Sequence, residues 1–141
     1  MRTIKFRGKT EDGRWIEGDF LHAWDSVMIQ YEIEFNNEDT YNAEDVDETT
    51  VGQFTGIFDC KSREVYEGDL LMDTSNPHSD LLEVCYNESL GLMAMRIHSE
   101  RYVTKCNSPF YQIYKIKYSK YEVVGNIHEN KQDFEKSFAF E

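Results

Sequence analysis

Cysteine and long apolar runs are scarce in this chain. The three cysteines, Cys60, Cys85 and Cys106, are an odd number, lie far apart and form no CxxC pair, which indicates reduced thiols rather than a disulfide framework. No apolar stretch is long enough to cross a bilayer. The start, Met1–Arg7, alternates basic and apolar residues and lacks the apolar run of a signal peptide. We therefore expect a soluble protein in a reducing cytoplasm.

Basic residues are also few relative to acidic ones. The formal net charge is -12 and the sequence pI is near 4.7, so long-range repulsion disfavours non-specific binding to nucleic acid. Aromatic residues make up 14% of the 141 residues, which is enough for the hydrophobic core of one domain. A division of this domain into two β-rich lobes, residues 1–60 and 61–130, with a tail at 131–141, stays open.

The apolar residues mostly alternate with polar ones, which predicts β-strands. In Ile29–Phe35 every second residue is apolar and the charges occupy the other face, as in a half-buried strand. Asp12-Gly13 lies between Lys5–Arg7 and Trp15–Glu17, and this turn chemistry predicts an opening β-hairpin. The fold class that we predict is mainly β with minor helix, built from short antiparallel strands that form a curled sheet or a small SH3-like barrel.

Further short segments rich in aromatic and branched residues predict more strands. They are Leu81–Tyr86, Leu92–Ile97, Phe110–Tyr118 and Tyr121–Ile127. A short C-terminal helix is predicted from Asn130, a candidate cap, with Phe134 and Phe138 on one face. This apolar tail, together with Phe140, also motivates the expectation of a homo-oligomer.

Two polar stretches are predicted to be exposed loops: Asn36–Glu48 and Asp73–Asp80. Asp45 and Asp47 alternate in the first stretch as calcium ligands can. However, no register supplies both the glycine and the glutamate that an EF-hand needs, so we favour a solvated run of charge.

Three candidate sites have simpler explanations. The glycines of Gly52–Gly56 lack the Lys-Ser/Thr ending of a phosphate loop, which favours a strand with a bulge or close packing. The histidines are scattered, and a zinc site from Cys85, His98 and Cys106 is less favoured than buried thiols. No carboxylate is singled out for catalysis, so we predict no catalytic residue, no metal and no cofactor, and an enzyme is the less favoured class.

A Tyr/Lys-rich segment, residues 111–121, offers an alternative function. Its alternation of rings and charges is typical of a stacking platform for single-stranded nucleic acid. The simpler interpretation is a strand pair with a packed aromatic face and lysines at an edge, which the net charge favours. The residues concerned are Tyr111, Tyr114, Tyr118, Tyr121, Lys115, Lys117 and Lys120.

One short segment recurs: Trp15–Leu21 (WIEGDFL) returns as Val65–Leu71 (VYEGDLL). A duplicated structural unit would place Gly18 and Gly68 at equivalent turn or bulge positions. Coincidence is the alternative, because Glu-Gly-Asp is an ordinary way to end one strand and begin another.

The acidic residues of the two copies admit two interpretations. We favour local capping, in which Asp19 and Asp69 each accept hydrogen bonds from nearby backbone amides. The alternative is one carboxylate cluster for a metal or for acid-base chemistry, which would need Glu17 and Glu67 to converge with them. Unpaired carboxylates repel one another when gathered, which counts against the cluster.

Four runs spread along the chain resemble the YopX family of phage and prophage proteins. They are Ile4–Arg7 (IKFR), Thr50–Gly56 (TVGQFTG), Tyr66–Leu70 (YEGDL) and Val124–Asn130 (VGNIHEN). The chain departs from the family at Asp59–Arg63 (DCKSR), where a turn resembling Asp-Lys-Asn-Gly is usual, and in the tail after Asn130. The resemblance covers nearly the whole chain.

The resemblance implies a phage or prophage origin, a β-rich fold and homo-oligomerisation, without an established activity or binding residue. We interpret the motif residues as fold signatures, because Gly and Asp at strand ends serve backbone geometry. They are Gly18, Asp19, Gly52, Gln53, Thr55, Gly56, Asp59, Glu67, Gly68, Asp69, Gly125, Asn126 and Glu129. The leading hypothesis is an accessory protein that assembles with itself and binds a basic host or phage protein in the host cytoplasm. Nucleic acid is a less favoured partner, and no membrane is expected.

Overall fold

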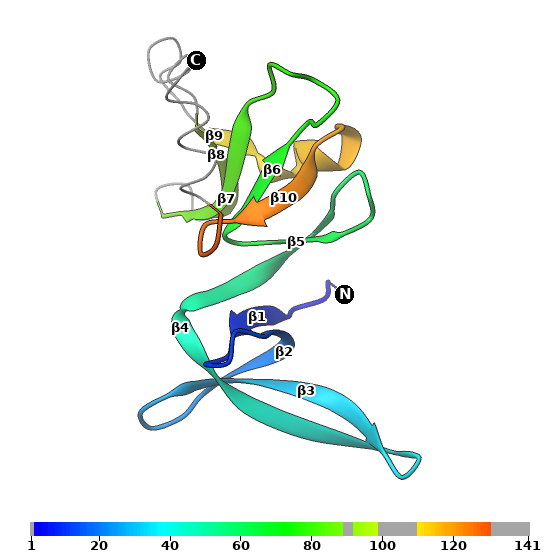
Figure 1. Ribbon diagram of the computed structural model, residues 1–141, viewed down its shortest axis with the longest axis vertical. Helices are drawn as coiled ribbons and strands as arrows, with labels where there is room; N and C mark the ends of the chain where they lie inside the picture. The colour runs from blue at the N-terminus through cyan, green and yellow to red at the C-terminus, as the bar shows by residue number, and fades with distance from the viewer. Residues whose placement is uncertain (1, 89–91, 99–109, 131–141) are drawn as a thin grey trace. The chain divides into compact units, whose positions relative to one another are not determined.

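The computed structural model describes residues 2–88, 92–98 and 110–130. The strands in these residues pair antiparallel, and the one helix that they form is a short 3-10 helix, η1 (Ile113–Tyr118; Figure 1). The strands are β1 (Phe6–Lys9), β2 (Trp15–His22), β3 (Val27–Phe35), β4 (Glu38–Phe58), β5 (Glu64–Tyr66), β6 (Asp69–Met72), β7 (Leu81–Asn87), β8 (Leu92–His98), β9 (Phe110–Gln112) and β10 (Glu122–Asn126). The predicted mainly β class is confirmed. The predicted C-terminal helix falls on residues 131–141, which lie outside the described residues.

The chain divides into two compact units, Met1–Phe54 and Thr55–Glu141. The lobes predicted from the sequence met between residues 60 and 61, so the division observed here falls six residues earlier. Strand β4 continues from the first unit into the second, and β5 follows it in the strand order.

In the first unit the sheet curls until its first strand meets its last. β1 pairs with β2, β2 with β3 and β3 with β4, and β1 also pairs with β4. Val27, Ile29 and Val46 form the buried centre, against which Phe6 and Phe20 pack with ring centroids 5.5 Å apart. The predicted face of β3 is buried at Ile29, whereas Ile33 and Phe35, which were predicted on the same buried face, are exposed.

The predicted opening hairpin is confirmed as β1 and β2. Gly13 has a φ of 88°, a left-handed conformation that glycine adopts without strain. The turn is closed by hydrogen bonds from the Thr10 amide to the Arg14 carbonyl (2.8 Å) and from the Gly13 amide to the Thr10 carbonyl (3.0 Å). Asp-Gly chemistry thus produced the expected turn.

The prediction of a loop over Asn36–Glu48 is wrong. Only Asn36 and Asn37 form a turn, with φ of 53° and 61°, and β4 begins at Glu38. β3 and β4 then pair without a break from Phe35 opposite Glu38 to Val27 opposite Val46. Asn tolerates positive φ, so two consecutive asparagines can reverse a strand without glycine.

In the second unit a five-stranded sheet has the order β10-β6-β7-β8-β9. Its core contains Val65, Leu71, Leu82, Val84, Met95 and Ile116. The predicted strand Phe110–Tyr118 is wrong beyond Gln112, because Ile113–Tyr118 form η1. A 3-10 helix has three residues per turn, so Ile113 and Ile116 share a face, and both pack at the core.

Candidate functional site

Four of the signature residues lie in β4. Gly52 pairs with Arg7 and Gln53 with Phe6, which joins the TVGQFTG run to β1. Gly56 has a φ of 82° with open space where a side chain would begin, so its glycine serves backbone conformation rather than close packing. The Thr55 hydroxyl donates to the Val65 carbonyl (2.7 Å). Each of these contacts is structural.

Asp59 fastens the DCKSR turn to β10. Its carboxylate has no exposed side-chain surface and accepts hydrogen bonds from the amides of Lys61 (2.9 Å), Arg63 (2.8 Å) and Val123 (2.9 Å). The Arg63 guanidinium forms an ion pair with Asp59 at 3.2 Å and a second ion pair with Glu122 at 3.2 Å. Burial alone would raise the pKa of Asp59, but the amide hydrogen bonds lower it below its ordinary value. The buried carboxylate is therefore held in its charged form.

The YEGD run and the GNI-x-EN run meet in the second unit. Asp69 pairs with Asn126 across β6 and β10, and the Ile127 amide donates to the Gly68 carbonyl (2.9 Å). The buried Asp69 carboxylate accepts the Tyr66 amide (2.7 Å). The two runs are thus neighbours in space although more than fifty residues separate them.

The end of the described chain forms a compact turn around Asn126. Its side-chain oxygen accepts the amides of His128 (3.0 Å) and Glu129 (3.1 Å), and its side-chain nitrogen donates to the Glu129 carboxylate (3.4 Å). A Cβ on Gly125 would lie 2.7 Å from the Asn130 side-chain oxygen, so glycine permits this close approach. Gly125, Asn126 and Glu129 shape the backbone here.

The duplication interpretation, under which Gly18 and Gly68 would occupy equivalent positions, is wrong. Gly18 lies inside β2, where a Cβ would come within 2.0 Å of the Gln30 carbonyl oxygen of β3. Gly68 lies in the turn between β5 and β6 with a φ of 94°. Asp69 accepts a backbone amide as predicted, whereas Asp19 is an exposed residue paired with Gln30 in the β2–β3 ladder. The same Glu-Gly-Asp tripeptide therefore occurs in two different backbone conformations.

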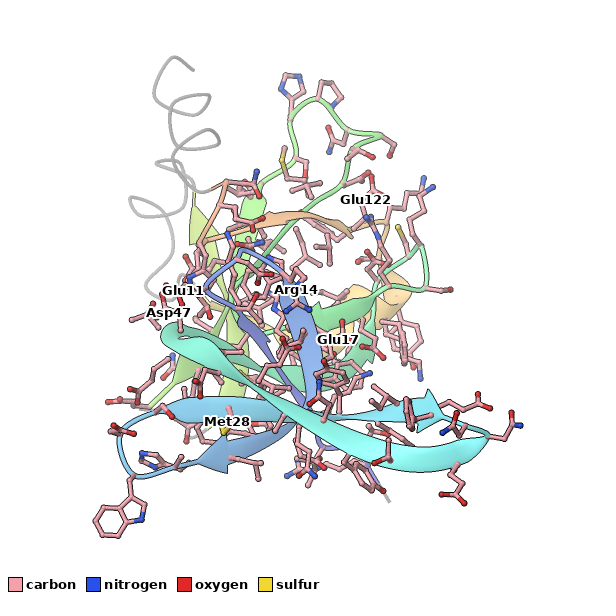
Figure 2. The ribbon with its side chains drawn as sticks, turned by 60° about the horizontal axis from the view of Figure 1, so that its bottom comes forward. Glu11, Arg14, Glu17, Met28, Asp47 and Glu122 are labelled. Carbon is pink, nitrogen blue, oxygen red and sulfur yellow. The ribbon has the colours of Figure 1, made fainter. Side chains whose placement is uncertain are left out.

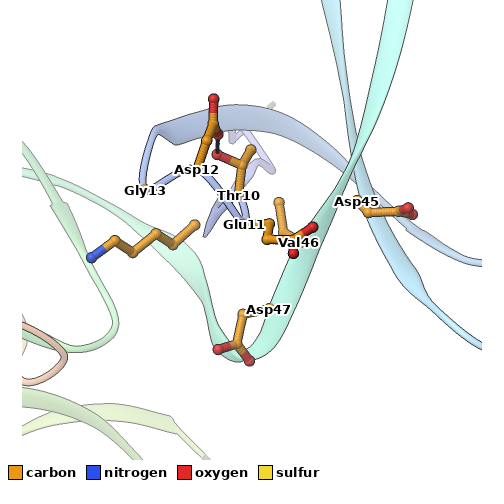
Figure 3. A pocket seen from close by; sticks show the side chains of 8 residues that line it. Thr10, Glu11, Asp12, Gly13, Asp45, Val46 and Asp47 are labelled. Atoms are coloured by element: carbon orange, nitrogen blue, oxygen red, sulfur yellow. Dashed lines mark hydrogen bonds between the residues drawn. The ribbon is translucent and has the colours of Figure 1, made fainter.

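An open hollow of about 680 Å³ lies beside the first hairpin (Figure 3). Residues of the β1–β2 turn and of β4 line it, among them the acidic residues Glu11, Asp12, Asp45 and Asp47. Asp12 accepts hydrogen bonds from the Thr10 hydroxyl and from Arg14, which lower its pKa. These hydrogen bonds within the hairpin stabilise the charged Asp12 carboxylate without a ligand.

The metal hypotheses gain no support. Across the residues that the structure describes, no group of three or more His, Cys, Asp or Glu side chains is arranged to hold a metal ion. Cys106 of the hypothetical zinc site lies outside the described residues, as does the side chain of His98. In the described part of the chain, none of the helices has the length and hydropathy needed to cross a membrane.

A two-stranded ribbon, residues 31–42, is the most exposed part of the first unit, and we call it the arm. Its β3 and β4 segments pair with each other (Figure 1), since the pairing of β3 with β2 ends at Gln30 and β4 reaches β1 only at Asp47. Figure 2 shows the ribbon with its side chains, and Met28 marks the end of β3 that joins the rest of the unit. The sequence pattern did not indicate the arm, because the part from Asn36 onward has the composition of an exposed loop.

The base of the arm is braced by polar contacts. Arg14 forms an ion pair with Glu44, whose carboxylate also accepts the Tyr31 hydroxyl (2.6 Å). Asn42 donates to the same hydroxyl (3.0 Å). The hydrogen bonds from Arg14, and then from Tyr31, lower the pKa of Glu44. The ribbon is therefore anchored in a defined orientation within its own unit.

Beyond this base the arm exposes large apolar side chains. Ile33 and Phe35 share one face, with exposures of 37% and 66%. The opposite face carries Tyr41, 64% exposed, among carboxylates. The alternation in Ile29–Phe35 thus predicted a shared face correctly, but that face leaves the core after Tyr31.

A second exposed surface lies on η1 and the residues that follow it. We call it the lysine patch: Tyr114, Lys115, Lys117, Tyr118 and Lys120, all exposed. Tyr121 is half-buried and packs against the core of the second unit, while Tyr114 and Tyr118 are 55% and 81% exposed. The predicted packed aromatic face is therefore wrong for these two rings, because the turn of η1 directs isoleucines inward instead.

Comparisons with known proteins agree with this fold. The family model described as YopX protein matches residues 5–135, so the chain belongs to the YopX family. The crystal structure of protein EF1440 from Enterococcus faecalis is similar, with a TM-score of 0.56 and 21% sequence identity over 92% of this chain and 96% of that chain. At this identity the likeness shows the fold alone. No curated protein matches the chain.

Proposed function

We propose that this protein is an interaction module that assembles with itself through the arm. The observation that carries the proposal is the exposure of Ile33, Phe35 and Tyr41 on a ribbon whose two strands pair with each other. An isolated two-stranded ribbon is marginally stable in water, and clustered exposed apolar side chains are typical of protein contacts. A second copy would cover these side chains.

Light scattering of the full chain at micromolar concentration tests the proposal. We expect an oligomeric mass for the natural protein and a monomeric mass for the double variant Phe35→Ser/Tyr41→Ser. Tyr86→Ser is the matched control, because Tyr86 is an exposed ring on β7, and it should leave the oligomer intact. A monomeric natural protein would overturn the proposal.

The setting that we propose is the cytoplasm of a host cell, where the protein acts as a phage or prophage accessory factor. Membership of the YopX family supports this setting. The acidic surface supports a basic protein of the host or the phage as a further partner, because complementary charge accelerates encounter. Capture by tagged protein at low and moderate salt tests it, and loss of capture in Glu32→Lys/Glu34→Lys is the expected result. Equal capture by that variant would contradict a basic partner.

A second candidate function is binding of single-stranded nucleic acid at the lysine patch. The specific observation is that Tyr114 and Tyr118 are exposed beside lysines, as a stacking platform requires. Titration with a fluorescent oligonucleotide at low salt should then show binding that Lys117→Glu weakens. The absence of any shift in the natural protein would exclude this function.

A further inference from the structure

Acidic and basic residues are concentrated in different segments of this chain. Residues 15–60 contain twelve Asp and Glu and no Lys or Arg, which equals the formal net charge of the whole protein. Residues 101–121 contain five Lys and Arg and no Asp or Glu. The arm lies in the first segment and the lysine patch in the second. One chain therefore displays two surfaces of opposite sign.

The acidic side of the arm is a continuous face. Glu32 lies directly opposite Tyr41, and Glu34 lies directly opposite Asp39. Directly opposed residues of an antiparallel pair project from the same face, so three carboxylates surround one exposed ring. All four residues are exposed.

The lysine patch has the complementary chemistry. Ile113 and Ile116 turn toward the core, which leaves the lysines and the rings of Tyr114 and Tyr118 on the outside. The Lys117 ammonium lies 5.8 Å from the centre of the Tyr118 ring, within the range of a cation–π contact. The ammonium groups can form ion pairs with carboxylates. The tyrosine rings beside them can stack against a further ring such as Tyr41.

We propose that the lysine patch of one copy receives the acidic face of the arm from a second copy. This inference rests on the proposed self-assembly and names the contact made by one face of the arm, the face that carries Tyr41. Two arms facing each other through their acidic faces would oppose like charges, which is unfavourable, whereas arm on patch pairs opposite charges. The contact joins two different surfaces, so it closes a two-fold dimer where two copies exchange arms reciprocally and otherwise generates rings or filaments.

A charge-exchange experiment tests the contact. The arm variant is Glu32→Lys/Glu34→Lys, and the patch variant is Lys117→Glu/Lys120→Glu. Each alone juxtaposes like charges, so its dissociation constant should rise at least about tenfold at low salt. An equimolar mixture of the two should assemble again, because each reversed surface then finds a complementary one. Added salt should weaken the natural assembly.

The control variant Glu11→Lys/Asp25→Lys makes the same change of charge at exposed sites of the first unit outside the arm, and it should assemble like the natural protein. Circular dichroism verifies that every variant is folded. If the natural protein is monomeric, the proposed function fails. If the natural protein assembles and the two variants assemble equally well, or their mixture stays dissociated, the arm-on-patch contact is overturned while self-assembly stands. Loss of oligonucleotide binding in the patch variant with unchanged assembly would assign the patch to nucleic acid instead.

Discussion

The tripeptide Glu-Gly-Asp occurs at residues 17–19 and again at residues 67–69, in two different structural settings. In the first copy the glycine lets β2 and β3 approach each other, and the flanking acids are exposed. In the second copy the glycine turns the chain between two strands, and the aspartate is buried. The difference teaches that neighbouring strands, rather than the tripeptide, decide which property of glycine is used.

The largest effect should come from Gly18→Ala. The new Cβ would lie 2.0 Å from the Gln30 carbonyl oxygen, a backbone atom that cannot turn aside, so β2 and β3 must separate. We expect the first unit to lose about 3 kcal/mol of unfolding free energy. Tryptophan fluorescence during urea unfolding measures it, because both tryptophans lie in the first unit. An unchanged midpoint would show that the close approach is not required.

Asp69→Ala should destabilise the second unit by about 2 kcal/mol, because the buried Tyr66 amide loses its acceptor. Asp19→Ala is the matched control in the other copy and should change stability by less than about 0.5 kcal/mol. Urea unfolding followed by circular dichroism and hydrogen exchange at the Tyr66 amide provide the measurements. Equal effects in the two copies would refute the distinction drawn between them.

Gly68→Ala should cost about 1–2 kcal/mol through backbone strain, because its φ of 94° is unfavourable for an L-residue with a Cβ. The expected signature is local: faster hydrogen exchange at the Ile127 amide, which donates to the Gly68 carbonyl. Protection of that amide at its natural level would mean that the turn adapts to alanine at little cost.

Glu67→Gln should have the smallest effect, and it should be stabilising. Burial raises the pKa of Glu67, so its carboxylate opposes folding above that pKa, and the opposition disappears as the pH falls and the group is protonated. We expect a gain of about 0.3 kcal/mol at pH 7, since solvent screens a half-buried group, and none in acid. Unfolding midpoints at both pH values measure it. Glu17→Gln, which removes an exposed contact with Lys5, should show no such gain.

Much of the fold was predictable because strand alternation and turn chemistry are local. The Asp12-Gly13 hairpin and the strands near Leu81, Leu92 and Tyr121 were all predicted close to their observed bounds. Each has apolar residues at a period of two or a glycine at a tight turn. Pairing with the neighbouring strand agrees with that local pattern.

The two misassigned segments show where local patterns fail. Asn36–Glu48 contains few apolar residues, yet it pairs with β3 residue by residue, because a ribbon can be held by its ladder and by turn geometry instead of burial. Ile113–Tyr118 has strand-like composition, yet its isoleucines fit the core at a period of three. The signal that was available for the first was the pair Asn36-Asn37, which can form a tight turn without glycine.

The sequence by itself determined the β-rich class, the resemblance to the YopX family and the separation of acidic from basic segments, because composition and period are properties of the chain. Only the tertiary structure decided that Asp69 is buried while Asp19 is exposed, that the YEGD and GNI-x-EN runs are neighbours, and that the arm and the lysine patch face solvent. Burial and pairing depend on which distant residues a side chain meets, and no local pattern specifies them.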